Sequence, residues 1–159
     1  MDELRVPARY YRSKSMTKKD TIRQRRALRK SRKLYTKGSY YQRPNVKSFR
    51  SRKSNHLGRL RKTYRVEKIG ASNELAKKTR CAKEGLEKIL NKGRGAYYSS
   101  GSRPNQTAES WAVARLASAL TGGNSSAYDY HILKTYCHPK SRALSMARKT
   151  CRRLKRTCK

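Results

Sequence analysis

Negative charge is scarce in this chain of 159 residues. Only 9 Asp and Glu stand against 43 Lys and Arg, which gives a formal net charge of +34 at pH 7. Such a charge opposes compaction unless a partner supplies counter-charge, so the composition predicts a polyanion or an acidic protein lattice as the partner. Charge alone does not distinguish DNA, RNA, anionic lipid headgroups and acidic protein, and these alternatives stay open here.

Large apolar side chains are scarce as well. Hydrophobic residues make up 35% of the chain, which has one Trp, one Phe and a mean hydropathy of −1.08. We therefore expect a modest core in the second half and an extended first half. No run approaches the roughly 18 apolar residues of a membrane-spanning helix, and no apolar segment follows Met1 as in a secretory signal. The 11 Tyr carry most of the aromatic content, and Tyr is suited to interfaces.

Patterns for catalysis or metal binding are weak. Three His and four Cys offer few nucleophile and base pairs, so we expect no enzyme, no cofactor and no small-molecule substrate. The cysteines are widely spaced, which does not match the close pairs of structural zinc sites. Their even number permits disulfides, although an intracellular chain ordinarily keeps its thiols reduced. These cysteines are Cys81, Cys137, Cys151 and Cys158.

The first half combines one helical segment with a long aperiodic one. Thr17 to Tyr35 is predicted as a helix, with Thr17 as N-cap and Asp20 in the first turn, near the positive end of the helix dipole. Its apolar stripe is thin, so we expect it to form fully only against a partner. Gly38 to Lys62 mixes Gly, Ser, Asn and Pro with Arg and Lys, and is predicted as an extended arm. We expect the isolated protein to be largely disordered up to about Lys62.

Helical patterns become stronger after Ser72. Ser72 can cap a first short helix, and a second is predicted from about Ala82 to Asn91, with Gly93 and Gly95 as stop signals. Residues 91–105 are then predicted as a loop. Within it, Tyr97 and Tyr98 are expected to cover the indole of Trp111.

The most apolar segment is 108–120, which is predicted as the buried central helix. A further helix is predicted over 124–133, and a last helix begins after Ser141 and carries a narrow apolar seam as far as Cys158. The fold class is therefore mainly α, with residues 1–66 as a basic helix and arm, 67–135 as a small helical module and 136–159 as a basic C-terminal helix. The expected structural core is Trp111, Leu116, Leu120, Ile132 and Leu133.

Residues 75–90 resemble a helix-turn-helix. Ala76 is a small residue where two helices would cross, but Arg80 stands where that motif usually has a Gly in left-handed conformation. Glu84 and Glu87 on the second helix would repel the phosphates of DNA. Two packed helices without base readout therefore compete with a DNA-reading motif.

A longer resemblance covers most of the chain to about Leu133. The segment GRGAYYSSGSRPNQT at 93–107, continued by SW at 110–111, ARLASALTGG at 114–123 and DYHIL at 129–133, resembles a small module found in large nucleocytoplasmic DNA viruses. The upstream RVPARY, TKKD, KSRK and KSF are similar to the basic region that precedes that module. The final basic helix lies outside the resemblance.

The resemblance implies a virion component, namely a minor capsid protein on the inner face of the shell, made in the host cytoplasm or nucleus. Its implied partners are the major capsid protein and other minor capsid proteins, with viral DNA or an anionic inner membrane as a further source of negative charge. The main alternative is a viral DNA-binding or packaging protein, and a ribosomal-type RNA-binding protein is also compatible with the composition.

The candidate contacts with a polyanion or a lattice are cations spread along the chain. They are Arg25, Arg26, Arg29, Arg32, Lys33, Arg50, Arg52, Lys53, Arg59, Arg61, Lys83, Lys88, Arg152 and Arg153.

Overall fold

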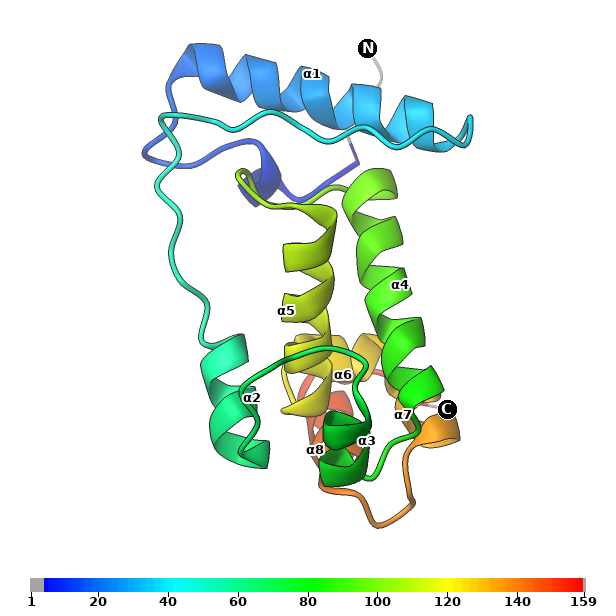
Figure 1. Cartoon of the computed structure of the whole chain (residues 1–159). Helices are drawn as coiled ribbons and strands as arrows, with labels where there is room; N and C mark the ends of the chain where they lie inside the picture. The colour runs from blue at the N-terminus through cyan, green and yellow to red at the C-terminus, as the bar shows by residue number, and fades with distance from the viewer. Residues whose placement is uncertain (1–4, 159) are drawn as a thin grey trace. The chain divides into compact units, whose positions relative to one another are not determined.

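A computed structural model describes residues 5–158 of the chain (Figure 1). Over these residues it contains eight α-helices, one short 3-10 helix and no strand, which confirms the predicted mainly α fold. No helix in this part of the chain is long and apolar enough to cross a membrane. The elements are η1 (Ala8–Tyr10), α1 (Lys18–Tyr35), α2 (His56–Tyr64), α3 (Asn73–Thr79), α4 (Lys83–Ser99), α5 (Ala108–Leu120), α6 (Asn124–Tyr128), α7 (Tyr130–Tyr136) and α8 (Arg142–Arg153).

The chain forms two compact units that do not follow the three segments drawn from the sequence. Unit 1 comprises residues 1–53 and 94–111, and unit 2 comprises 54–93 and 112–159. The segments 1–66, 67–135 and 136–159 were separated by composition and charge. The units are separated by packing, and packing joins residues 94–111 to the N-terminal region.

In unit 1, helix α1 begins where the sequence predicts. Thr17 is extended, and its hydroxyl accepts a hydrogen bond from the backbone N–H of Asp20 at 3.1 Å. The helix buries one narrow side, formed by Gln24, Leu28 and Ser31. This spacing of four and three residues places the three side chains on one stripe of the helix and leaves the rest of its surface to cations.

The predicted arm is docked along α1, so the expectation of a disordered first half is corrected. Figure 1 shows the segment after α1 running back beside that helix. The Lys30 ammonium lies 4.4 Å from the centre of the Tyr41 ring, and the backbone N–H of Thr17 donates to the Ser48 hydroxyl at 3.1 Å. Later arm residues thus meet earlier helix residues, which is an antiparallel arrangement.

Arg43 is the buried anchor of this arm, with 6% of its surface exposed. Its guanidinium donates to the hydroxyls of Ser31 at 3.0 Å and Ser102 at 2.9 Å, and to the carbonyl of Tyr97 at 2.7 Å. It also lies 3.9 Å from the centre of the Tyr97 ring, and burial lowers the pKa of Arg43 from its ordinary value. Among the described residues, the partners of this guanidinium are neutral acceptors and a ring face.

Helix α4 runs through two glycines that were predicted to end it. It continues to Ser99. Gly93 lies so close to α5 that a side chain at this position would approach the backbone of Ala112 to 2.6 Å. Close packing against α5 therefore offsets the low helix propensity of Gly. The helix stops before Gly101, whose φ of +91° is unfavourable for other residues. Residues 91–99 are consequently helical, and the predicted loop is reduced to residues 100–105.

Trp111 has different neighbours from those predicted. Its indole is only partly buried and belongs to a small cluster around Tyr10 and Leu28 in unit 1. Tyr10 meets it edge to face, with ring centres 5.8 Å apart. Tyr97 and Tyr98 pack instead against each other and the arm, because helical continuation of α4 turns them toward Arg43.

Unit 2 holds the larger apolar core. Four of the expected core residues, Leu116, Leu120, Ile132 and Leu133, lie in it and are buried. The core predicted from the sequence did not include the residues that α2, α3 and the first half of α4 contribute. These are Leu60, Tyr64, Leu75, Leu86 and Ile89.

The helix expected over 124–133 is two short helices, α6 and α7, which meet at Asp129. Asp129 is fully buried, and the guanidinium of Arg115 donates to both of its carboxylate oxygens at 2.8 Å. The ammonium of Lys92 lies 3.1 Å from the same carboxylate. The break between the two helices therefore places the Asp129 carboxylate where it can pair with both Arg115 and Lys92.

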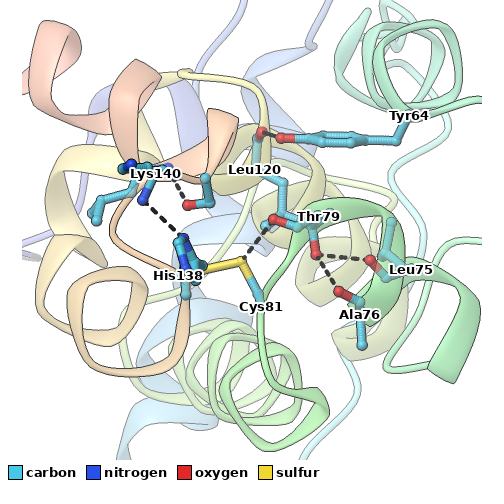
Figure 2. Close-up of a disulfide and its surroundings, with 11 residues drawn as sticks. Tyr64, Leu75, Ala76, Thr79, Cys81, Leu120, His138 and Lys140 are labelled. Atoms are coloured by element: carbon cyan, nitrogen blue, oxygen red, sulfur yellow. Dashed lines mark hydrogen bonds between the residues drawn. A yellow bond between two sulfur atoms is a disulfide. The ribbon is translucent and has the colours of Figure 1, made fainter.

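The C-terminal helix α8 is capped by Ser141 as expected but ends at Arg153. The predicted seam to Cys158 is therefore wrong in its last turn, where Lys155 has a φ of 51°. Cys158 turns back to form a disulfide with Cys151. A second disulfide joins Cys81 to Cys137 beside the Thr79 carbonyl (Figure 2), so all four cysteines are paired.

Replacing Arg43 with Ala is expected to destabilise unit 1 by about 2–4 kcal/mol, because it leaves buried hydroxyls and a carbonyl without their donor. Arg43→Lys should fall between Ala and wild type, since an ammonium cannot reproduce the planar fork. Urea unfolding followed by the fluorescence of Trp111, the single Trp and a member of this unit, measures the change. Exposed Arg50→Ala is the control, and equal effects from both substitutions would contradict the anchoring role.

Tyr64 predicts an alkaline loss of stability in unit 2. Its buried hydroxyl donates to the Leu120 carbonyl at 2.7 Å (Figure 2), and burial raises the pKa of Tyr64 to about 12. The unfolded phenol ionises near 10, so this stabilisation is complete below about pH 10 and is lost as the pH rises towards 12. Tyr64→Phe should therefore be less stable at neutral pH yet show a flatter decline over that window. Parallel declines for the two proteins, measured by urea unfolding, would contradict this.

Candidate polyanion-binding surface

Cations divide almost evenly between the units, so their arrangement, not their number, identifies a surface. Unit 1 has 21 Lys and Arg and unit 2 has 22. The densest group is on α1, where nine of the 18 residues are Lys or Arg and only Asp20 is acidic.

The exposed side of α1 carries a regular stripe of positive charge, which we call the outer face of α1. Its members recur every three or four residues, opposite the buried stripe of Gln24, Leu28 and Ser31, and all are exposed. A rise of 1.5 Å per residue spreads the stripe over about 21 Å, with a charge about every 5 Å. A linear polyanion fits such a stripe better than a small ligand does. The outer face of α1 consists of Lys19, Arg23, Arg26, Lys30 and Lys33.

The docked arm extends this charge past the beginning of α1. Two hydrogen bonds join the segment before α1 to the arm. The backbone N–H of Thr17 donates to the Ser48 hydroxyl, and the backbone N–H of Arg50 donates to the Ser15 hydroxyl. Lys14, Lys47 and Arg50 gather around this junction and line a hollow there. Arm and helix therefore form one cationic surface in unit 1.

The one acid of α1 is occupied by the arm. The hydroxyl and the backbone N–H of Ser48 both donate to the Asp20 carboxylate, and these bonds lower the pKa of Asp20 from its ordinary value. Asp20 therefore remains ionised while it fastens the arm. Its charge reduces the local positive potential only at the first turn of α1.

Residues 7–135 match a family of proteins of unknown function, DUF5824. The chain belongs to the DUF5824 family. No curated protein and no solved structure matches it at a significant level. The match includes α1, the whole arm and residues 94–111 of unit 1, and it ends inside α7, before α8.

The sequence-predicted contacts of this DUF5824 protein separate into two sets. In unit 1, Arg25, Arg26, Arg29, Arg32 and Lys33 are on α1, and Arg50, Arg52 and Lys53 are in the arm. All of these are exposed except Arg32, which is partly buried, and the Arg25 guanidinium lies 5.3 Å from the centre of the Tyr11 ring. This set shares one surface with the outer face of α1.

The unit 2 set is exposed but scattered over three helices. Some of its members serve that unit's own structure: Arg61 donates to the Glu67 carbonyl at 3.0 Å, and Arg153 donates to the Asn124 amide oxygen at 3.1 Å. The structure does not gather these cations into a single face. The set is Arg59 and Arg61 on α2, Lys83 and Lys88 on α4, and Arg152 and Arg153 on α8.

Sequence reading missed Lys14, Lys47 and Arg43. No local pattern distinguishes Lys14 or Lys47 from other cations, because their proximity depends on docking of the arm. Arg43 did carry a signal, since the following Pro44 restrains it to an extended backbone. An extended residue inside a flexible arm is a reason to expect a fixed contact.

The DUF5824 chain also has a group of three tyrosines in unit 1, of which Tyr40 is exposed and Tyr35 and Tyr98 are partly buried. Tyr40 is 72% exposed, and its ring centre lies 5.0 Å from that of Tyr98 and 6.2 Å from that of Tyr35. Among residues 5–158, no three His, Cys, Asp or Glu side chains are close enough to hold a metal ion. The groups that unit 1 presents at this surface are cations and aromatic rings.

Removing three charges from the outer face of α1 is expected to weaken binding to duplex DNA. In Lys19→Gln/Arg26→Gln/Lys33→Gln, the slope of log affinity against log salt should fall by about 2 to 3, since each lost phosphate contact removes about 0.9. The control Lys62→Gln/Lys68→Gln/Lys140→Gln, in unit 2, should change it by less than 1. Fluorescence anisotropy with several unrelated duplexes measures both, and equal slopes for the two triple variants would contradict a localised surface.

Proposed function

We propose that this DUF5824 protein is a non-enzymatic structural protein of a large double-stranded DNA virus. In this proposal it is a minor capsid protein that cements capsomers on the inner side of the shell and neutralises negative charge there. Its partners would be the major capsid protein, other minor capsid proteins, and viral DNA or an anionic inner membrane. It would be made in the host cytoplasm or nucleus.

The observation that carries the polyanion part is the outer face of α1 together with the docked arm. These cations lie on a scaffold fixed by the buried Arg43 and by the contact between Ser48 and Asp20. A fixed cationic surface loses less conformational entropy on binding than a disordered tail does. That property suits a protein that holds a permanent place in an assembly.

The placement in a virus rests on the resemblance of GRGAYYSSGSRPNQT and the segments around it. In the structure this stretch supplies Tyr97 and Ser102, which bind Arg43, and Asn105, whose amide oxygen accepts from the backbone N–H of Val46 at 2.6 Å. The most distinctive part of the sequence therefore fastens the arm. We take this as support for a module that presents the arm rigidly to its partners.

Purified particles test the proposal directly. We expect the protein in a fixed, symmetry-related number of copies per particle, and we expect it to stay with shells emptied of their genome. Quantitative mass spectrometry of full and emptied particles measures both. A copy number that varies with genome length, with loss on emptying, would contradict the capsid role and favour a packaging protein.

A viral DNA-binding protein is the second candidate, favoured by the turn between α3 and α4. Arg80 adopts the left-handed conformation that a helix-turn-helix usually gives to Gly, with φ 57° and ψ 37°. The Arg80 carbonyl accepts from the backbone N–H of His138 at 2.8 Å, which holds the turn from outside. Glu84 and Glu87 remain exposed at the start of α4, where they would repel phosphates. Strong preference for one duplex, abolished by Lys83→Gln and Lys88→Gln, would support this candidate.

A further inference from the structure

A basic hollow lies in unit 1 where the arm returns to the beginning of α1. It is open, has a volume of about 550 Å³, and is lined by Lys14, Ser15, Lys47, Ser48 and Arg50. We call it the basic hollow. Three of its five lining side chains are cations, and they come from two chain segments more than 30 residues apart in the sequence.

The backbone around the basic hollow is fixed by hydrogen bonds. The Ser15 hydroxyl accepts from the backbone N–H of Arg50 at 3.1 Å and shares a 3.0 Å hydrogen bond with Ser13. The Ser48 hydroxyl accepts from the backbone N–H of Thr17 and donates to Asp20. Both serines are thus occupied in joining the two segments, which leaves the three cations as the donors for a ligand.

Within the part of the chain that the structure describes, the cations of the basic hollow have no acidic partner. Among residues 5–158, Lys14, Lys47 and Arg50 form no ion pair with an acid. The nearest acid identified at this junction, Asp20, is bound to Ser48 and Arg23. Three cations held close together without a counter-ion repel one another, so an external anion would stabilise this arrangement.

We propose that the basic hollow binds a backbone phosphate of nucleic acid. A phosphate offers several acceptor oxygens to donors that converge from different directions, which suits three cations from two segments. The hollow is open, so a polymer can enter and leave it, and the polymer can continue along the outer face of α1. This inference rests on the proposed function, because it names the polyanion and the group by which it is held.

Two triple variants of the full chain test the basic hollow. Lys14→Gln/Lys47→Gln/Arg50→Gln removes its cations. The matched control Arg5→Gln/Lys37→Gln/Arg103→Gln removes three exposed cations of the same unit. For a 20-base-pair duplex, the hollow variant should reduce the slope of log affinity against log salt by about 1 to 3, at about 0.9 per phosphate contact, and the control by less than half as much. Thermal unfolding of both variants checks that they remain folded.

A second measurement separates a built site from diffuse charge. Inorganic phosphate, titrated into the wild-type protein, should shift the amide NMR signals of Ser48 and Arg50, whereas acetate at equal ionic strength should not. These shifts should be absent in the hollow variant and present in the control.

The possible outcomes distinguish this inference from the proposed function. If both triple variants weaken duplex binding equally, or if acetate reproduces the phosphate shifts, the basic hollow is not a phosphate site, and the capsid proposal is unaffected. If the hollow variant loses binding to vesicles with 30% phosphatidylserine but keeps duplex binding, the phosphate belongs to lipid and the nucleic acid assignment is wrong. If the wild-type protein binds neither duplex DNA nor these vesicles, both the phosphate site and the polyanion part of the proposed function are wrong.

Discussion

The burial of the Arg43 guanidinium is the constraint on which unit 1 depends. Removing a cation from water is costly, and among residues 5–158 no carboxylate pairs with this guanidinium. Three hydrogen bonds offset part of this cost, and their acceptors, on Ser31, Tyr97 and Ser102, come from α1, from α4 and from the loop after it. One side chain thus specifies the positions of three segments that share little apolar surface.

Each unit buries a charged side chain, and the two units stabilise that buried charge in different ways. Unit 2 places Asp129 in its interior, where it pairs with Arg115 and Lys92 beside a sizeable apolar core. The apolar cluster of unit 1 is small, with Tyr10 and Leu28 as its buried members, and the buried Arg43 is held nearby by hydroxyls, a carbonyl and a ring face. Arg43 thus donates its side-chain hydrogen bonds to neutral acceptors and not to one of the chain's 9 acids.

Local patterns allowed some elements to be predicted, and the failures have a common physical cause. Thr17 and Ser141 cap their helices as expected, because a cap depends on residues within one turn. Gly93, by contrast, has the sequence pattern of a helix end, and only its packing against Ala112 explains why the helix contains it. Trp111 packs against Tyr10, which is about 100 residues away in sequence. The candidate surface followed the same rule. The α1 cations could be found by composition, whereas the basic hollow exists only because residues 47–50 return to residues 14–17.

The discontinuous make-up of unit 1 has a consequence for synthesis of the chain. Arg43 meets Tyr97 and Ser102 across 54 and 59 residues, and Val46 meets Asn105 across 59. A ribosome makes the chain from the N-terminus, so the first 53 residues, with 19 of the 43 Lys and Arg, emerge well before the partners that hold the arm exist. During that interval the most cationic part of the nascent chain is open, close to ribosomal RNA, and closure of unit 1 is what withdraws Arg43 from competing anions.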